Sequence, residues 1–149
     1  MNSQSQSSRI IVGVDGSDYS SNALRVAGRM ASLMDEPIEV ISCIEKSNRR
    51  LASRFESEPN RYTSQLSETV ELLVEEALDR AFGNSRPPGL TVTVRFDNPA
   101  EALVDESRAA QLLVVGRHGS GGFLNQPIGS VSKACAVHAH CPVLVVPQD

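Results

Sequence analysis

The chain has 149 residues, of which 40% are hydrophobic and 21% are charged. This size and composition fit one folded domain and exclude a disordered chain. A net charge of −4, from 18 acidic and 14 basic residues, argues against broad binding to nucleic acid or anionic membranes. Four Phe, two Tyr and no Trp leave little material for stacking bases.

Residues 1–8 are polar and lack the apolar centre of a signal peptide, so we expect a disordered tail before one domain over residues 9–149. No segment approaches the roughly 18 consecutive apolar residues that a membrane span needs. The three cysteines are an odd number without the spacing of a disulfide framework. We therefore expect a cytoplasmic protein with reduced thiols.

The first third of the chain alternates strand and helix patterns. Residues 9–15 form a β-rich run that ends at a Gly-Ser-Asp turn, and residues 23–34 place apolar side chains on one helical face. A second apolar run, residues 38–44, predicts another strand. We interpret the polar residues 45–64 as a long exposed connection.

The middle of the chain repeats this alternation. Apolar residues at three- and four-residue steps predict a helix over residues 66–82, and Gly83 follows where a helix end favours positive φ. Residues 90–96 alternate apolar and polar side chains, as an edge strand does. Asn98-Pro99-Ala100-Glu101 is typical of a capped helix start, and we expect that helix to reach about Ala110.

The last third contains a fully apolar strand over residues 112–115, a glycine-rich loop over 116–122, a helix over 128–139 and a strand over 142–147. Five strands that alternate with four helices predict an α/β fold. We expect a single doubly wound parallel sheet of Rossmann-like architecture with strand order 3-2-1-4-5.

The glycine-rich loop is the strongest candidate for chemistry. The chain has no Gly-Lys pair for a P-loop, and no GxGxxG follows the first strand. Gly116-Arg117-His118-Gly119 is instead followed, after nine residues, by Gly129-Ser130 at a helix start. Glycines admit a ligand close to the backbone, and the N–H groups of a helix start attract anions. The alternative is a flexible Gly/Ser surface loop.

The position of this loop favours a binding site. In a sheet of order 3-2-1-4-5, ligands bind at the carboxyl ends of the first and fourth strands, where the order reverses. Asp15 ends the first strand and Gly116 follows the fourth. A carboxylate at this point can accept hydrogen bonds from the hydroxyl groups of a ribose, while the apolar backbone beside it flanks an adenine.

These motifs resemble the universal stress protein family, specifically its ATP-binding branch with the pattern GxxG, nine residues, then Gly and Ser or Thr. The likeness covers nearly the whole chain, through Ile10-Ile11-Val12-Gly13-Val14-Asp15-Gly16-Ser17, Asn98-Pro99-Ala100-Glu101 and the final apolar strand. It implies that the chain binds ATP, with or without Mg²⁺, or another adenine nucleotide. It also implies a homodimer formed through the last strand, where Val143 to Val146 would otherwise be an exposed apolar edge.

The resemblance assigns binding roles to individual residues. It places the Asp15 carboxylate on the ribose, and the backbone of Gly13, Val14 and Ile44 near the adenine. The remaining residues line the loop or hold the phosphates: Val115, Gly116, His118, Gly119, Gly129, Ser130, Val131 and Ser132.

Two departures from the family pattern leave the motif glycines intact. Asp97 stands where the family often has Gly, and Pro127 stands where many members have an apolar residue. Residues 48–64 are the least family-like part of the chain, and their arginines can be read either as a docking site for an acidic partner or as a solvated loop.

Two alternatives use the same residues differently. A response-regulator receiver would use Asp15 and Asp97, but it needs an acidic pair after the first strand and a lysine after the last. Asp15 has no adjacent acidic residue, and residues 147–149 contain no lysine. Cys135, His138, His140 and Cys141 are donors of the types that bind zinc, although a buried helix cysteine and helix-end histidines explain them without metal.

Phosphoryl transfer requires a positioned nucleophile, a metal site and groups that stabilise the transition state. We can assign no residue to these roles. The sequence therefore favours a nucleotide-responsive stress or signalling protein, with slow ATP hydrolysis and a nucleotide-independent dimeric module as the alternatives.

Overall fold

The structure is a computed structural model that describes residues 9–15, 20–45, 59–118 and 128–148. Its centre is one five-stranded sheet in which all neighbouring strands are parallel and the order is β3-β2-β1-β4-β5. The predicted fold class and strand order are confirmed. The strands are β1 (Ile10–Gly13), β2 (Ile38–Ile44), β3 (Thr91–Phe96), β4 (Leu112–Gly116) and β5 (Val143–Val146).

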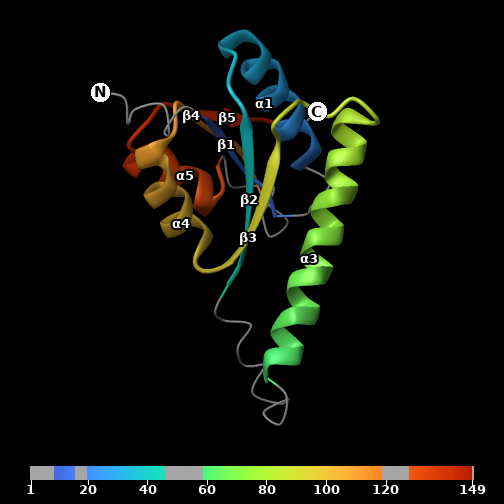
Figure 1. Cartoon of the computed structure of the whole chain (residues 1–149). Coiled ribbons are helices and arrows are strands. Elements are labelled where there is room, and N and C mark those ends of the chain that lie inside the picture. Colours follow the sequence, from blue (N-terminus) through green and yellow to red (C-terminus); the bar gives the residue numbers. More distant parts are fainter. Residues whose placement is uncertain (1–8, 16–19, 46–58, 119–127, 149) are drawn as a thin grey trace, which may run out of the picture.

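Within the described residues, four α-helices cover the sheet, with α1 and α3 on one face and α4 and α5 on the other (Figure 1). They are α1 (Ser20–Met34), α3 (Pro59–Phe82), α4 (Pro99–Glu106) and α5 (Ser130–His138).

Two helix boundaries correct the sequence-based expectations. The polar connection expected over residues 45–64 is wrong for residues 59–64, which belong to α3; residues 46–58 lie outside the described residues. These first turns carry no apolar periodicity, so the pattern did not indicate a helix. The helix expected to reach Ala110 ends at Glu106 and continues as a 3₁₀ turn over Ser107–Ala109.

The ends of the helices follow local chemistry. Gly83 has φ 58° and donates its N–H to the Asp79 carbonyl at 2.8 Å, so it closes α3 in the left-handed conformation expected of it. At the start of α4, the Asn98 side chain accepts the Glu101 N–H at 3.0 Å, and Pro99 occupies the first turn. The predicted capping of this helix is confirmed.

The two faces of the sheet are buried in different ways. Beneath α1 and α3 lies the larger apolar core, which includes Leu24, Val40 and Leu78. Beneath α4 and α5 lies a smaller core around Ile11, Leu113 and the other buried residues of that face. The fully apolar β4 contributes to both cores, as predicted for a central strand covered on both sides.

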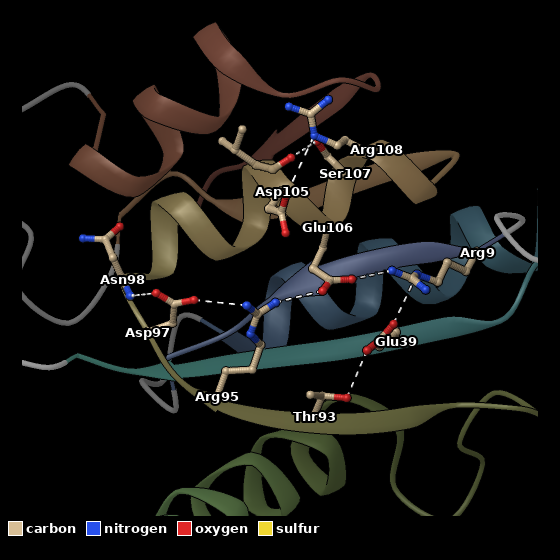
Figure 2. A network of polar contacts seen from close by, with 11 residues as sticks. Arg9, Glu39, Thr93, Arg95, Asp97, Asn98, Asp105, Glu106, Ser107 and Arg108 are labelled. Carbon is tan, nitrogen blue, oxygen red and sulfur yellow. Dashed lines mark hydrogen bonds and ion pairs between the residues drawn. The ribbon is translucent and has the colours of Figure 1, made fainter.

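On the α4 face, a network of ion pairs replaces the apolar core next to β3 (Figure 2). Glu106, at the end of α4, accepts hydrogen bonds from Arg9 at 2.7 Å and from Arg95 at 2.8 Å. Arg9 also pairs with Glu39 at 3.1 Å, and Arg95 with Asp97 at 3.0 Å. The network thus ties α4 to β2 and β3 through side chains that are only partly exposed.

Candidate functional site

The strand order reverses between β1 and β4, which pair in parallel with Gly13 opposite Val115. Asp15 lies two residues beyond Gly13, and Gly116 lies one residue beyond Val115. Both therefore lie at the carboxyl ends of adjacent strands, at the point where α/β sheets of this type bind ligands. The structure brings the two halves of the predicted site to one edge of the sheet.

The Asp15 carboxylate is exposed, and the first residue of α1 holds it. Ser20 Oγ donates to Asp15 Oδ1 at 3.1 Å and accepts the Asp15 backbone N–H at 3.3 Å. Ser20 itself is buried, with 5% of its surface exposed. The start of a helix also favours a nearby negative charge, because its N–H groups point toward that charge. Sequence reasoning missed Ser20, since a serine near a predicted helix start has many possible roles.

Gly13 has a packing role that its motif did not indicate. A Cβ atom at Gly13 would lie 2.6 Å from Leu103 Cδ1 of α4 and 3.5 Å from Val115 Cγ1. Glycine therefore lets α4 pack directly on the end of β1. This explains the residue through close helix-to-strand contact, whether or not a ligand lies nearby.

Two backbone groups assigned to the adenine by resemblance already take part in the sheet. The Val14 N–H donates to the Ile41 carbonyl at 3.0 Å, and the Ile44 carbonyl accepts the Asp97 N–H at 3.0 Å. The side chains of Val14 and Ile44 are buried. Val14 follows the end of β1, and Ile44 ends the neighbouring strand β2.

The two ends of the glycine loop are held together. The Arg117 N–H donates to the Val146 carbonyl of β5 at 2.7 Å, and the Gly129 N–H donates to the Arg117 carbonyl at 2.7 Å. The hydroxyl of Ser132 donates to the Gly116 carbonyl. We call these three contacts the loop neck. They place the start of α5 next to the end of β4.

The four residues that the resemblance assigns to phosphate lie at the start of α5, and they differ in their surroundings. Gly129 is the N-cap, with φ −71° and ψ 161°, a conformation open to any residue. Ser130 is exposed, whereas Val131 packs against the core beneath α5. Ser132 is buried at 4% exposure and its hydroxyl serves the loop neck.

The other loop residues are only partly described. His118 is half-buried at the end of the described segment after β4, and Gly116 is also half-buried. A Cβ atom at Gly116 would lie 3.4 Å from the His118 carbonyl oxygen, an ordinary contact distance. Gly119 and Pro127 lie outside the described residues.

Cys135 and the backbone of His140 take part in packing near the C-terminus. Among the residues that the structure describes, no three His, Cys, Asp or Glu side chains are grouped so that they could hold a metal ion. Cys135 is fully buried in α5, and burial raises its pKa to about 11. The His140 N–H donates to Ser107 Oγ at 2.9 Å, which joins the end of α5 to the 3₁₀ turn.

Asp97 lies at the end of the β3 edge strand, two strands away from β1. It pairs with Arg95 and accepts the Asn98 N–H at 2.8 Å. The structure therefore does not bring Asp97 and Asp15 together as a receiver would need.

β5 forms the opposite edge of the sheet, and three of its four apolar residues, Val143 to Val145, are only half-buried. This matches the exposed apolar edge expected from the sequence. No helix in the described part of the chain is both long and apolar enough to cross a membrane.

Comparison with known proteins gives a family match along most of the chain. The model of the universal stress protein family matches residues 7–147. A curated universal stress protein of Mycobacterium tuberculosis is 36% identical over 146 residues, which are 97% of this chain and 47% of that relative. The chain spans about half the length of the curated relatives it matches.

Solved structures share the fold. A universal stress protein in complex with cAMP superposes with a TM-score of 0.65 at 24% identity, covering 93% of this chain and 95% of that chain. A universal stress protein from Archaeoglobus fulgidus in complex with dAMP gives a TM-score of 0.55 at 18% identity, covering 93% and 96%. The sheet order, the length of the family match and this shared fold agree, and the chain belongs to the universal stress protein family.

Proposed function

We propose that this chain binds an adenine nucleotide, with ATP as the cellular ligand, at the carboxyl ends of β1 and β4. The observation that carries this proposal is the meeting of Asp15, Gly116 and the start of α5 at the reversal of strand order. The complexes of related structures with cAMP and dAMP support an adenine nucleotide as the ligand class.

One end of the proposed site takes the nucleoside. The exposed Asp15 carboxylate accepts hydrogen bonds from the ribose hydroxyls. The hydrogen bond from Ser20 holds this carboxylate at the carboxyl end of β1. The adenine lies against the backbone of Gly13, Val14, Ile44 and Val115. The Val14 N–H and the Ile44 carbonyl are engaged in the sheet, so contacts to the base come from the remaining backbone groups of these residues.

The other end takes the phosphates. The backbone N–H groups of Ser130, Val131 and Ser132, at the start of α5, face the anion and carry the positive end of the helix dipole. The Gly129 N–H already donates to the Arg117 carbonyl, so Gly129 contributes close approach of the backbone and not this donor. Gly116 and His118 line the approach, and the family resemblance adds Gly119, which lies outside the described residues. The triphosphate of ATP carries more negative charge than cAMP or dAMP, and a Mg²⁺ ion held by the phosphate oxygens would offset part of it.

We further propose that the protein acts as a nucleotide-responsive homodimer in a stress or signalling process, and that it retains ATP rather than turning it over. The second copy joins through the apolar β5 edge. Because the loop neck connects Val146 of β5 to Gly129 of α5, the nucleotide site and the proposed dimer seam share one backbone segment. Ligand binding can then shift the equilibrium between states of this segment.

Calorimetric titration with ATP, ADP, AMP and cAMP, with and without Mg²⁺, tests the proposal. We expect binding by the parent protein and at least about 100-fold weaker binding by Gly129→Glu, because a carboxylate beside phosphate is repelled. The Gly129 backbone conformation suits any residue, so this change does not strain the backbone dihedral angles. Val137→Glu adds the same charge at an exposed position near the other end of α5 and should bind as the parent does.

Failure of the parent protein to bind any of the four nucleotides would overturn the proposal. Equal losses in Gly129→Glu and Val137→Glu would place the phosphates elsewhere. Phosphate release by the parent protein in the same samples, absent from Gly129→Glu, would make the protein a slow ATPase instead of a nucleotide-retaining protein.

A further inference from the structure

Ser20 is a polar residue buried at the candidate site that the nucleotide motif does not include. It begins α1, it is 5% exposed, and its hydroxyl makes two hydrogen bonds to the same residue, Asp15. A buried serine hydroxyl usually forms its hydrogen bonds with nearby backbone groups. Here the hydroxyl donates to a side-chain carboxylate that is itself exposed.

The two hydrogen bonds tie Ser20 both to the backbone and to the carboxylate of Asp15, and so favour one orientation of that carboxylate. The bond from the Asp15 N–H to Ser20 Oγ at 3.3 Å makes the hydroxyl oxygen an acceptor, which directs the hydroxyl hydrogen toward Asp15 Oδ1 at 3.1 Å. The first residue of a helix is a rigid platform for this contact. Loss of the Ser20 hydroxyl would widen the range of rotamers open to the Asp15 carboxylate.

From this geometry we infer that Ser20 is a positioning residue that holds the Asp15 carboxylate ready to select nucleotides with sugar hydroxyl groups over nucleotides that lack them. The inference rests on the proposed nucleotide site and states which part of the ligand the Asp15–Ser20 pair reads. Ser20 makes no contact with the sugar itself.

The chemical reason is the strength of hydrogen bonds to a fixed charge. A carboxylate has about four acceptor positions, and Ser20 uses one on Oδ1. A sugar hydroxyl that donates to an oriented carboxylate gains a charge-assisted hydrogen bond. A ligand without the hydroxyl leaves the carboxylate desolvated and loses that gain. Without Ser20, the carboxylate can rotate toward water, and the loss of affinity for a ligand that lacks the hydroxyl becomes smaller.

The test compares ATP with 2′,3′-dideoxy-ATP in calorimetric titrations of full-length variants. In the parent we expect ATP to bind at least about 10-fold more tightly than the dideoxy form. In Ser20→Ala the ratio should fall below about 3-fold, mainly because ATP binding weakens. Ser20→Thr keeps the hydroxyl and should keep most of the parent ratio.

Ser107→Ala is the matched control for the loss of a buried serine. Ser107 is 1% exposed, its hydroxyl donates to the Val104 carbonyl at 2.5 Å and it accepts the His140 N–H at 2.9 Å, away from the site. This variant should lose stability and keep the parent ratio. Ser20→Cys, which keeps the size and offers a weaker donor, replaces Ser20→Ala if the alanine variant does not fold.

The outcomes separate the two proposals. ATP binding with an unchanged ratio in Ser20→Ala or Ser20→Cys would overturn the role of Ser20 and leave the nucleotide site standing. Equal binding of ATP and dideoxy-ATP by the parent would show that Asp15 does not read the sugar, again without touching the nucleotide site. Absence of adenine nucleotide binding by the parent would overturn both.

Discussion

The strands β3 and β5 lie at opposite edges of one sheet but expose different chemistry. On β3, Thr93 and Arg95 face the α4 side and make contacts with Glu39, Glu106 and Asp97. On β5, the half-buried residues are all apolar and belong to the two cores. The same sheet therefore ends in a network of charges at one edge and in an apolar strand at the other.

This difference between β3 and β5 shows how the side chains of an edge strand can hinder or permit pairing with a strand of another chain. Charged side chains at a strand edge oppose the addition of another strand, because pairing would bury them. An apolar edge carries no such obstacle. The contrast supports β5, and not β3, as the strand through which two copies meet in the proposed homodimer.

Placing a charge on β5 should give the largest effect. We expect Val145→Lys to weaken dimerisation by about 4 kcal/mol, roughly 1,000-fold, because a charge within an apolar interface must be desolvated. Sedimentation over a range of concentrations measures the change. Thr91→Lys adds the same charge at an exposed position of β3 and should leave the oligomeric state unaltered. A parent protein that is monomeric at all concentrations would refute the dimer.

The reactivity of the Cys43 thiol reports how burial and the neighbouring charges set its pKa beside β3. Cys43 lies opposite Arg95 in the sheet, yet burial raises its pKa to about 11, against the lowering effect of Arg95 and with the raising effects of Asp97 and Glu45. At pH 8.5 we expect alkylation of Cys43 to be about 100-fold slower in the folded protein than in urea, because the thiolate is the reactive form.

The direction of the pH effect follows from the raised pKa. The folded protein keeps the Cys43 proton that the unfolded chain releases, so this stabilisation is complete below about pH 9 and is lost as the pH rises toward about 11. Asp97→Asn removes a negative neighbour and should speed alkylation. Equal rates in folded and unfolded protein at pH 8.5 would contradict the burial of this thiol.

Removing the centre of the ion-pair network should have the smallest effect. Glu106→Ala breaks the bonds to Arg9 and Arg95, and we expect it to lower the free energy of unfolding by about 1 to 2 kcal/mol, less in 1 M salt. Urea denaturation measures this. Arg108→Ala removes an exposed pair with Asp105 at 3.8 Å and should change stability by under about 0.5 kcal/mol. Similar losses of unfolding free energy in both variants would show that the network stabilises the fold no more than one exposed ion pair does.

Short-range patterns predicted the fold well. The parallel α/β sheet followed from five strands alternating with four helices, although this alternation does not by itself fix the strand order. The capping of α4 by Asn98 and the positive φ of Gly83 followed from residue chemistry within a few positions. The start of α3 was missed because residues 59–64 have no apolar face, and a helix that extends past its contacts with the sheet carries no hydrophobic period.

The site was predicted in outline but not in its contacts. The motif placed Asp15 and Gly116 together, because parallel strands end at a common edge. The contact of Gly13 with Leu103 and the pairing of Arg9 with Glu106 join residues about 90 or more positions apart, and no local pattern records them. Ser132 was assigned to phosphate by resemblance, and its hydroxyl also closes the loop neck.

The loop neck has a consequence for how this protein can vary. Because Arg117 and Gly129 are joined to each other and to β5, the chain between them is a closed loop whose ends stay fixed whatever its length. Doubling the length of such a loop costs only about 0.6 kcal/mol in closure entropy. Insertions and deletions between these two residues therefore leave the position of α5 almost unaffected, so the length of this segment can vary without moving the start of α5 relative to β4.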